Sequence, residues 1–437
     1  MKKAEHLNEI VQVFGPEPLS KKNDEEDDLE QFFCETMSVR TGDVYDSPLD
    51  DIFADCCRPS GNNAHLLLGH KGCGKSTELN YLQQRFEKAG HQVAMISCIN
   101  DADIFNIAYW DLLILIAEKL CYLADKKECA LDKDLLKNIA NYWKDIERIE
   151  EKSTDAQVEG TAQAGGGFNF FGLGFLTRIK GDIKYGSSRR TEIREHVKKR
   201  PAELIGYIRE IADTLTKKSD GKQPIIIVEE LDKIEPEVAN KLFFNTPLSQ
   251  LPFPTIFTFP ISLFYAPMFA GLEGFFSVKV LPMIKIKTLA GEPFAEGVKI
   301  IEEIIKKRAD VNLFTPDALT LLIEKTGGCL RDLFSMIINA ARRAEKRRAE
   351  KVEAEDVERV LIELKSRLSR RIEVKHYEFL ATIHQSAKKR TEIADHEMLL
   401  EMLQGMIVLE YNGKRWHDVH PLILDFLREQ GCINGND

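Results

Sequence analysis

Short apolar runs alternate with amphipathic segments through the first two thirds of the chain. The runs AHLLLG (64–69), HQVAMISC (91–98) and PIIIVEE (224–230) are almost continuously hydrophobic, which is typical of strands buried on both faces of a parallel sheet. Between them, apolar residues recur at helical spacing from Lys75 to Lys88 and again from Pro201 onward. This alternation of strands and helices predicts an α/β fold built on a parallel sheet.

The pattern changes beyond residue 290, where the strand pattern ends and helical periodicity takes over. The last segment has two further helical stretches and then two apolar runs separated by Asn412–Gly413, a dipeptide that favours a tight hairpin. Two helices followed by a hairpin are the arrangement of a winged helix. We therefore predict four parts: a polar N-terminal leader (1–40), an α/β core (41–290), a helical lid (291–365) and a C-terminal winged-helix domain (366–437).

A segment rich in glycine and phenylalanine, residues 151–190, interrupts the core. This composition fits a hairpin insertion or a mobile loop. Its aromatic residues either form an exposed tip that docks onto a partner or pack onto the core. Packing onto the core is the preferred interpretation, because monomers rarely expose large apolar patches. The residues concerned are Phe168, Phe170, Phe171 and Phe175.

Composition and charge exclude several classes of protein. With 43% hydrophobic residues, 30% charged residues and a formal net charge of −10, the chain is globular and has no overall attraction for nucleic acid, so contact with DNA requires a local basic patch. The uncharged stretch 254–272 has the length of a membrane span, but Pro254, Pro260 and Pro267 interrupt it. A buried strand followed by an apolar loop is therefore favoured, and no membrane partner is expected.

The cysteines and the N-terminus indicate the compartment. Nine cysteines are scattered along the chain without a C-x-x-C pair, and Cys73 lies inside a glycine-rich loop. This usage favours reduced thiols over disulfides or zinc ligands. The N-terminus MKKAEHLNEI lacks the apolar centre of a secretory signal. These features predict a cytoplasmic protein.

The stretch LLLGHKGCGKST (66–77) contains the most specific motif of the chain. Its spacing, Gly69-x-x-x-x-Gly74-Lys75-Ser76, lies between a predicted strand and a predicted helix, as a phosphate-binding loop requires. The backbone N–H groups of such a loop wrap phosphate oxygens, the lysine contacts the outer phosphates, and the serine hydroxyl binds Mg²⁺. The residues predicted to bind the nucleotide are Gly69, His70, Lys71, Gly72, Cys73, Gly74, Lys75, Ser76 and Thr77.

Acidic residues directly follow the apolar run 225–228. We predict that Glu229 holds Mg²⁺ together with Ser76, and that Glu230 is the general base that orients the attacking water. Asp232 competes with Glu230 for this second role. Together with the glycine-rich loop, these acids predict nucleotide hydrolysis that depends on Mg²⁺.

Four motifs together resemble a P-loop ATPase of the AAA+ superclass: GHKGCGKST, IIIVEELDK, TFPIS and TGGCLRDL. The initiator-like (origin-recognition) branch and the STAND branch, which end in a winged helix, are the most similar, and the likeness spans residues 45–430. It implies that the nucleotide is ATP and that Thr258 or Ser262 occupies the sensor-1 position. It also implies that Arg331 in the lid contacts the γ-phosphate, which gives Lys75, Glu230, Arg331 and Thr258 as the catalytic set.

Two departures from the family modify this expectation. Glu229 stands where relatives have an aspartate, which lengthens the arm toward Mg²⁺. The chain has no arginine between Arg209 and Arg308, the interval in which ring-forming relatives carry a trans-acting arginine finger, and Lys241 lacks the planar fork of arginine. We therefore expect slow ATP hydrolysis and a nucleotide-dependent switch rather than a processive ring motor.

Two functions remain open. In the first, ATP clamps the core against the lid and changes what the winged helix or the insertion presents to a protein partner; the family likeness associates this with prokaryotic signalling or anti-phage defence. In the second, the protein is a DNA-associated, initiator-like ATPase that loads or regulates a partner on duplex DNA. Asp395, Glu397 and Glu401 in the expected reading helix disfavour sequence-specific recognition, which leaves weak, non-specific contact with the DNA backbone. A homo-oligomer is compatible with either function.

Overall fold

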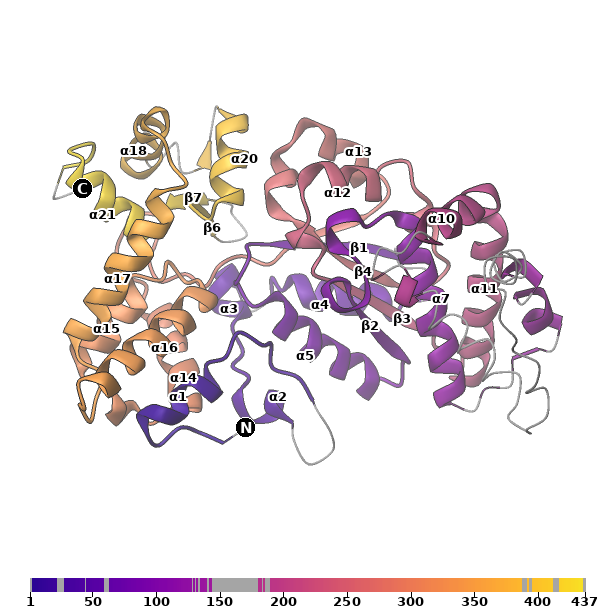
Figure 1. Cartoon of the computed structure of the whole chain (residues 1–437), viewed down its shortest axis with the longest axis horizontal. Coiled ribbons are helices and arrows are strands. Elements are labelled where there is room, and N and C mark those ends of the chain that lie inside the picture. Colours follow the sequence, from indigo (N-terminus) through magenta and orange to yellow (C-terminus); the bar gives the residue numbers. More distant parts are fainter. Residues whose placement is uncertain are drawn as a thin grey trace, which may run out of the picture.

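The computed structural model arranges the chain as a sheet-based core, a helical lid beside it and a C-terminal domain above the lid (Figure 1). The described residues are 2–21, 27–43, 45–58, 63–127, 129, 131–132, 134–139, 141–143, 180–182, 184, 189–386, 391–392, 395–411 and 416–434. Most of the predicted 151–190 insertion, including its phenylalanines, lies outside them.

Five parallel strands form the central sheet in the order β2-β3-β4-β1-β5. They are β1 (Ala64–Gly69), β2 (Val93–Ser97), β3 (Ile225–Glu229), β4 (Thr255–Pro260) and β5 (Ser277–Val280). Gly69 pairs with Pro260 at the end of β4, and Ser97 pairs with Glu229. The carboxyl ends of these strands therefore form one edge of the sheet. The predicted α/β fold with a parallel sheet is confirmed.

Helices cover both faces of the sheet, which explains why its strands are apolar at every position. One face packs against α4 (Pro48–Cys56) and α5 (Lys75–Lys88), the other against α7 (Tyr109–Lys126), α11 (Pro201–Lys218) and α12 (Pro236–Phe243). Successive residues of β3 therefore point to opposite faces of the sheet: Ile227 packs in the apolar core on the side of α4 and α5, and Val228 packs in the core on the side of α7, α11 and α12. The helix α10 (Arg189–Lys199) extends the second layer.

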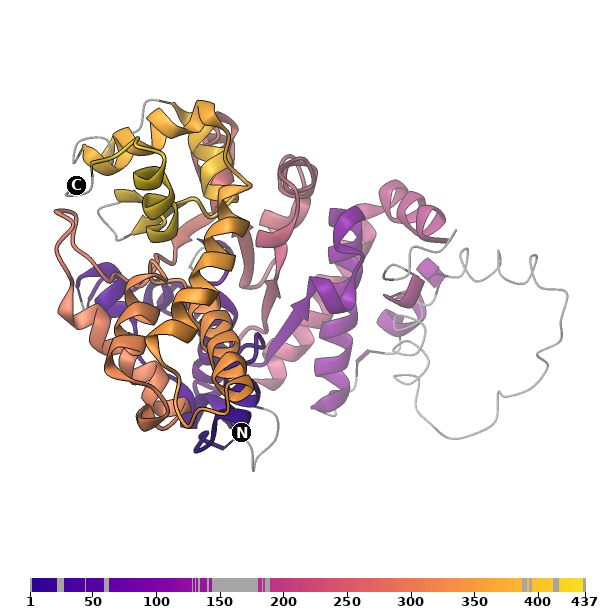
Figure 2. The ribbon, with the colours of Figure 1, turned by 60° about the vertical axis from the view of Figure 1, so that its left-hand side comes forward.

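The lid consists of four amphipathic helices. They are α14 (Ala295–Arg308), α15 (Pro316–Glu324), α16 (Leu330–Lys346) and α17 (Ala354–Ser369). In α16 the buried residues follow the three- and four-residue spacing of one helix face: Leu333, Met336, Ile337, Ala340, Ala341 and Ala344. The helix α17 runs from the lid into the C-terminal domain (Figure 2).

The C-terminal domain contains the predicted order of two helices and a hairpin. Its elements are α18 (Tyr377–Gln385), α20 (His396–Gln404), β6 (Val408–Tyr411), β7 (Trp416–Val419) and α21 (Pro421–Glu429). The strands β6 and β7 pair antiparallel. The predicted turn at Asn412–Gly413 lies outside the described residues.

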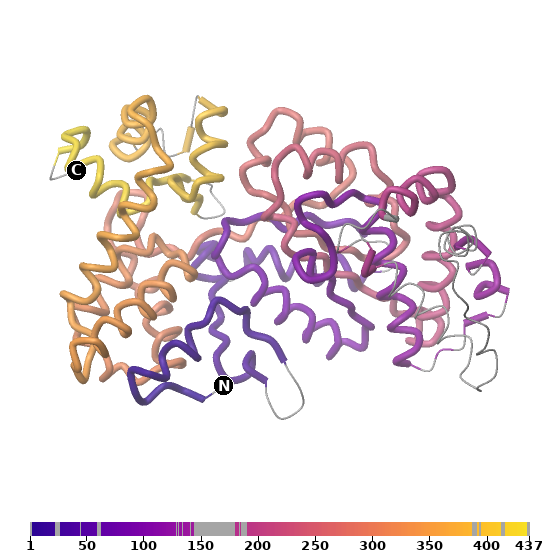
Figure 3. Tube along the Cα trace, viewed as in Figure 1, coloured from indigo at the N-terminus to yellow at the C-terminus, as the bar shows by residue number. Residues whose placement is uncertain are grey.

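The N-terminal segment differs from the polar leader expected for residues 1–40. It contains α1 (Ile10–Val13), α2 (Asp28–Phe32) and α3 (Met37–Thr41), and it runs along the lid and beneath α5 (Figure 3). Ile10 and Phe14 are fully buried in the same core as the lid helices. The backbone of Ala4 exchanges hydrogen bonds of 2.8 Å with Arg308 and Asp310 at the end of α14. The N-terminal segment is thus part of the folded structure: its first apolar residues pack on the lid, and Leu19, Leu29 and Phe32 form a small cluster beside Tyr81 of α5.

The uncharged stretch 254–272 forms the predicted buried strand, β4, and continues into short helices where a loop was predicted. Phe257 and Phe259 point into the core between the sheet and α12. Within the part of the chain that the structure describes, no helix combines the length and the apolar character needed to cross a membrane.

Candidate nucleotide-binding site

A cavity of about 1010 Å³ lies between the core, the lid and the N-terminal segment. This volume is at the upper end of the range of about 300–1,000 Å³ found for small-molecule sites. On the side of the core it is lined by Gly72, Gly74, Lys75, Ser76, Thr77, Glu229, Glu230 and Asp232. On the side of the lid it is lined by Arg308, Leu330, Arg331, Phe334, Ser335, Ile338, Asn339 and Arg342. The structure therefore brings the predicted loop, acids and lid arginine to one cavity.

The loop between β1 and α5, here called the P-loop (residues 69–76), has a backbone suited to anions. Gly72 and Gly74 have φ angles of 86° and 104°, in the left-handed region that glycine adopts without strain. Gly72 has a second constraint, because a Cβ atom there would lie 2.6 Å from the Cβ of Arg331. Helix α5 begins at Lys75, so the positive end of its dipole lies at the loop.

The Lys75 ammonium is buried at the centre of the P-loop. Its Nζ donates hydrogen bonds to the carbonyl oxygens of Gly69 (2.7 Å) and His70 (2.9 Å) and pairs with Oδ2 of Asp232 at 2.8 Å. Burial, the largest single influence, lowers the pKa of Lys75, but the charge and hydrogen bond of Asp232 together with the neighbouring Cys73 outweigh it, so that the net pKa lies above the usual value. The lysine is therefore held charged at the position where the motif predicts phosphate.

Glu229 and Ser76 fit the predicted Mg²⁺ site. The Oε2 atom of Glu229 is buried and has no hydrogen-bond partner among the described residues. Burial raises the pKa of Glu229 to about 7, and a hydrogen bond with Ser76 acts in the opposite direction. Hard divalent cations prefer carboxylate and hydroxyl oxygens, and such a cation would satisfy the unpaired oxygen. The donor set is therefore suited to Mg²⁺.

Glu230 is anchored to the neighbouring strand end. Its Oε2 accepts hydrogen bonds from Oγ of Ser97 (2.6 Å) and from the N–H of Ile99 (3.0 Å), and its Oε1 pairs with Nζ of Lys233 at 2.9 Å. Burial raises the pKa of Glu230, but these hydrogen bonds outweigh it and hold the pKa below the usual value. Its φ of 74° is also rare for a residue other than glycine. An ionised carboxylate thus lines the cavity, and its lowered pKa makes it a weaker proton acceptor than a free glutamate.

Arg331 brings the lid to the P-loop. Its backbone N–H donates to the carbonyl oxygen of Gly72 at 3.2 Å, and its side chain lines the large cavity. Among the described residues, none forms a hydrogen bond or ion pair with its guanidinium group. The predicted lid arginine therefore presents an uncompensated fork of donors beside the phosphate loop, a geometry suited to an anion.

Thr258, the residue predicted to act as sensor 1, does not face the cavity. It lies in the interior of β4 opposite Leu67 and is 1% exposed. Its Oγ1 accepts a hydrogen bond of 2.9 Å from the N–H of Leu231, so the hydroxyl is used to hold the turn after β3. The physical reason is its position in the strand. Thr258 lies two residues before the end of β4, so its side chain stays inside the sheet and does not reach the edge where the cavity lies. Ser262, the alternative, follows β4 and lines a smaller pocket that also includes Asp232.

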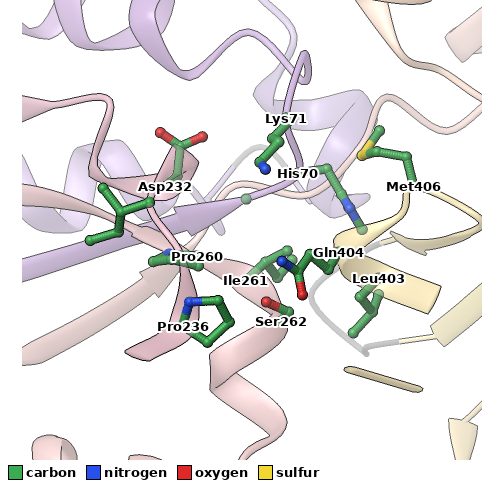
Figure 4. A pocket seen from close by; sticks show the side chains of 12 residues that line it. His70, Lys71, Asp232, Pro236, Pro260, Ile261, Ser262, Leu403, Gln404 and Met406 are labelled. Atoms are coloured by element: carbon green, nitrogen blue, oxygen red, sulfur yellow. The ribbon is translucent and has the colours of Figure 1, made fainter. Parts of the chain in front are cut away.

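The first residues of the predicted nucleotide-binding set face that smaller pocket, which measures about 20 Å³ (Figure 4). Gly69, His70 and Lys71 line it together with residues of α20 and the loop that follows: Leu403, Gln404 and Met406. This volume holds about one water molecule. The predicted set is therefore divided: the glycines from Gly72 onward, Lys75, Ser76 and Thr77 line the large cavity, and the first three residues contact the C-terminal domain.

His70 connects the P-loop to the hairpin of the C-terminal domain. Its Nε2 accepts a hydrogen bond of 2.8 Å from the N–H of Glu410 in β6. The Glu410 carboxylate in turn bonds to the hydroxyl of Tyr265 and lies 3.8 Å from Nε2 of His417. Burial lowers the pKa of His70 to about 3, so the ring is neutral and able to accept. Sequence reasoning did not anticipate this contact, because its partners are 340 residues apart.

The N-terminal segment supplies the wall of the large cavity that the sequence did not predict. Its lining residues are Val11, Phe14, Gly15, Pro16, Glu17, Pro18, Leu19, Ser20, Phe32, Phe33, Cys34, Thr36 and Arg40. Phe14 packs edge-on against Phe334 of α16, with ring centroids 5.4 Å apart. The N–H of Leu19 donates to Oγ1 of Thr77 at 3.3 Å, so this wall is tied to helix α5 as well as to the lid.

Arg40 is hydrogen-bonded to the P-loop, and the sequence did not predict this contact either. It is 1% exposed, and its guanidinium donates to Oγ1 of Thr36 (2.8 Å) and to the carbonyl oxygens of Cys73 (2.7 Å) and Pro282 (2.5 Å). In a trans peptide the N–H points opposite to the carbonyl group. Arg40 therefore turns the N–H of Gly74 away from itself. No spacing rule joins an arginine to a loop 33 residues further along the chain.

Fold and site together define an α/β architecture of the P-loop nucleotide-binding class: a parallel strand, a glycine-rich loop, a helix, and acids at the end of a second strand. No protein-family model matches the sequence, and neither does any curated protein.

Solved structures with a similar chain path include Cdc6p from Pyrobaculum aerophilum, with 13% identity, a TM-score of 0.40, and coverage of 96% of this chain and 98% of that chain. ORC2 from Aeropyrum pernix, solved as ADPNP–ADP complexes, has 10% identity, a TM-score of 0.37, and coverage of 87% and 90%. The RuvB Holliday junction branch migration motor of Thermotoga maritima has 11% identity, a TM-score of 0.34, and coverage of 87% and 93%.

Proposed function

We propose that the protein binds ATP with Mg²⁺ and hydrolyses it slowly, as a nucleotide-dependent conformational switch of the AAA+ type. One observation carries this proposal: Lys75, the Ser76–Glu229 pair and Arg331 all line a single cavity of about 1010 Å³. The first three belong to the core and the last belongs to the lid. A ligand that contacts both would favour the conformation in which core and lid are close.

Each residue has a distinct task in this proposal. The P-loop amides and Lys75 hold the phosphates, while Ser76 and Glu229 hold Mg²⁺, which neutralises charge on the outer phosphate oxygens when bound. Glu230 orients the attacking water and accepts its proton. Arg331 contacts the terminal phosphate from the lid. Loss of this phosphate on hydrolysis therefore weakens the contact between lid and core.

Two features support slow turnover. Glu230 accepts hydrogen bonds from Ser97, Ile99 and Lys233, which lower its pKa and so make it a weaker base for the attacking water. In addition, the interval between Arg209 and Arg308 contains no arginine to serve as a finger in trans, and such a finger raises the rate by about 10³- to 10⁵-fold where it is present. Both features suit a protein that stays in one nucleotide state until a partner acts.

We assign the output of the switch to the C-terminal domain, which we interpret as a winged helix made of α18, α20 and the β6–β7 hairpin. Its hairpin contacts the P-loop through His70, so a change at the phosphates is transmitted to a surface that a protein partner can bind. By the family likeness, the setting that we propose is prokaryotic signalling or anti-phage defence in the cytoplasm.

The first experiment is isothermal calorimetry of the purified full chain with ATP, ADP and GTP, with Mg²⁺ and with EDTA. We expect a saturable binding heat with ATP and a higher affinity for ATP in Mg²⁺ than in EDTA. The affinity for GTP is expected to be lower. A parallel phosphate-release assay is expected to give slow turnover. Absence of heat with ATP in the presence of Mg²⁺ would remove the proposal.

The alternative, an initiator-like ATPase on duplex DNA, is favoured by the basic run at the end of α16. That run is partly neutralised, because Arg347 pairs with Glu353 and Asp356 at 2.8 and 2.7 Å. A filter-binding titration with duplex DNA, with and without ATP, separates the two functions. Binding that falls steeply with salt, together with phosphate release stimulated by DNA, would establish the alternative.

A further inference from the structure

Three carboxylates lie at the end of β3 or just after it, and each has a different partner. Glu229 lies against the serine of the predicted metal site, and Glu230 is anchored to the end of β2, as described above. Asp232, in the short 3-10 helix that follows β3, instead pairs with Lys75 at 2.8 Å. Asp232 is therefore the acid of this edge that contacts the P-loop lysine.

The Lys75 ammonium has no donor left for a ligand. An ammonium group has three N–H donors, and the three acceptors are the carbonyl oxygens of Gly69 and His70 and the carboxylate of Asp232. The two carbonyls belong to the loop itself and hold its shape. Asp232 belongs to another element and is an anion, like a phosphate. A phosphate oxygen that reaches Lys75 must therefore replace Asp232 or share the ammonium with it.

We propose that Asp232 is a positioning residue that occupies the place of the outer phosphate on Lys75 in the nucleotide-free protein and competes with the nucleotide for that ammonium. This inference rests on the proposed function, since it assigns a regulatory role within the same site. In the empty site, Asp232 balances the buried charge of Lys75, which would otherwise be unpaired beside Arg331. When a nucleotide binds, the same carboxylate repels the phosphates and so weakens binding.

The surroundings make this competition strong. The side chains of Lys75 and Asp232 are 6% and 7% exposed, so solvent and salt screen their charges much less than on the surface. Asp232 also lines both the large cavity and the small pocket beside the loop, and Figure 4 shows it on the side of that pocket opposite Met406. The carboxylate therefore has room in the large cavity to turn away from Lys75.

The test compares wild type with Asp232→Asn, whose amide oxygen keeps an acceptor for Lys75 and removes only the charge. Affinities for ADP and for inorganic tripolyphosphate are measured by calorimetry, in EDTA and in Mg²⁺. We expect Asp232→Asn to bind both probes roughly tenfold more tightly in EDTA. Tripolyphosphate lacks adenosine, so a gain with this probe locates the effect at the phosphate end. Asp232→Glu restores the charge and is expected to return the affinity toward that of wild type.

The matched control is Asp213→Asn, which removes a charge from the exposed face of α11 and is expected to leave both affinities unchanged. An unchanged or reduced affinity of Asp232→Asn in EDTA would overturn this inference. The proposed function would still stand if wild type binds the nucleotide. A loss of affinity in Asp232→Asn that is seen only with Mg²⁺ would also overturn the inference, because it would assign Asp232 to binding of the metal ion. Absence of binding by wild type would remove the proposed function and this inference with it. Circular dichroism verifies folding of each variant, and Asp232→Ser serves as a second charge-removing variant with the same expected gain.

Discussion

The two ends of the cavity are built in different ways. The phosphate end comes from two local stretches of the core: the P-loop with the start of α5, and the end of β3. The opposite end is assembled from the lid helices and a segment near the N-terminus, which are about 300 residues apart in sequence but share one apolar core. Charge and backbone geometry shape the first end, whereas packing shapes the second.

This difference predicts that residues at the two ends of the cavity have different roles. Substitutions at the phosphate end should change binding or hydrolysis and leave the fold intact. Substitutions at the lid end should change stability and closure first, and nucleotide affinity as a consequence. Four substitutions test this separation, and they follow from the largest expected effect to the smallest.

Glu230→Gln is expected to lower the rate of phosphate release by about 10²- to 10⁴-fold, because the variant lacks the proton acceptor for the attacking water. ATP affinity should stay close to wild type, since the side chain keeps its size and an acceptor for Ser97. The measurement pairs single-turnover phosphate release with calorimetry. Undiminished phosphate release would show that another residue is the general base. Asp232→Asn in the same assay then tests whether that residue is Asp232.

Phe14→Ala is expected to lower the free energy of unfolding by about 3–5 kcal/mol, the usual cost of deleting a fully buried phenylalanine. Phe14 is 0% exposed and packs against Phe334. Thermal melting measures the change. The control is Phe105→Ala, in which the ring is 88% exposed and the expected change is within about 0.5 kcal/mol. Equal melting temperatures for the two variants would contradict the N-terminal wall described above.

Lys75→Ala is expected to weaken MgATP binding by about a hundredfold, since hydrogen bonds to charged groups contribute about 1.5–3 kcal/mol each. Lys71→Ala is the matched control in the same loop, because Lys71 lines the small pocket instead of the large cavity. Its affinity should remain within a few-fold of wild type. A comparable loss in both variants would show that the loop, and not the Lys75 charge, carries the affinity.

Arg331→Ala is expected to weaken ATP binding by roughly tenfold and ADP binding by less, because its guanidinium meets the terminal phosphate in the proposed complex. Arg359→Ala, an exposed arginine on α17, is the control and should leave both affinities unchanged. The ratio of ATP to ADP affinity is the informative quantity. An equal loss for both nucleotides would place Arg331 away from the terminal phosphate.

The same division determines what could be predicted from the sequence. The strands β1 and β3, the helix α5 and the P-loop were predictable, because a parallel strand buried on both faces is a continuous apolar run and the loop motif is local. The wall formed by Phe14 and Arg40 was not, since isolated buried residues in a polar segment have no periodicity. Apolar composition also does not determine where a strand that is buried throughout ends, so the position of Thr258 inside β4 and away from the large cavity could not be read from the sequence.

The hydrogen bond from β6 to His70 has a consequence for how this protein can evolve. Its donor is the main-chain N–H of residue 410, which every amino acid except proline provides. Replacing Glu410 would remove the bond of its carboxylate to Tyr265, but the main-chain donor to His70 remains wherever β6 keeps its path, so this bond does not depend on the identity of residue 410. Only the acceptor ring or the path of the strand can be selected for or against.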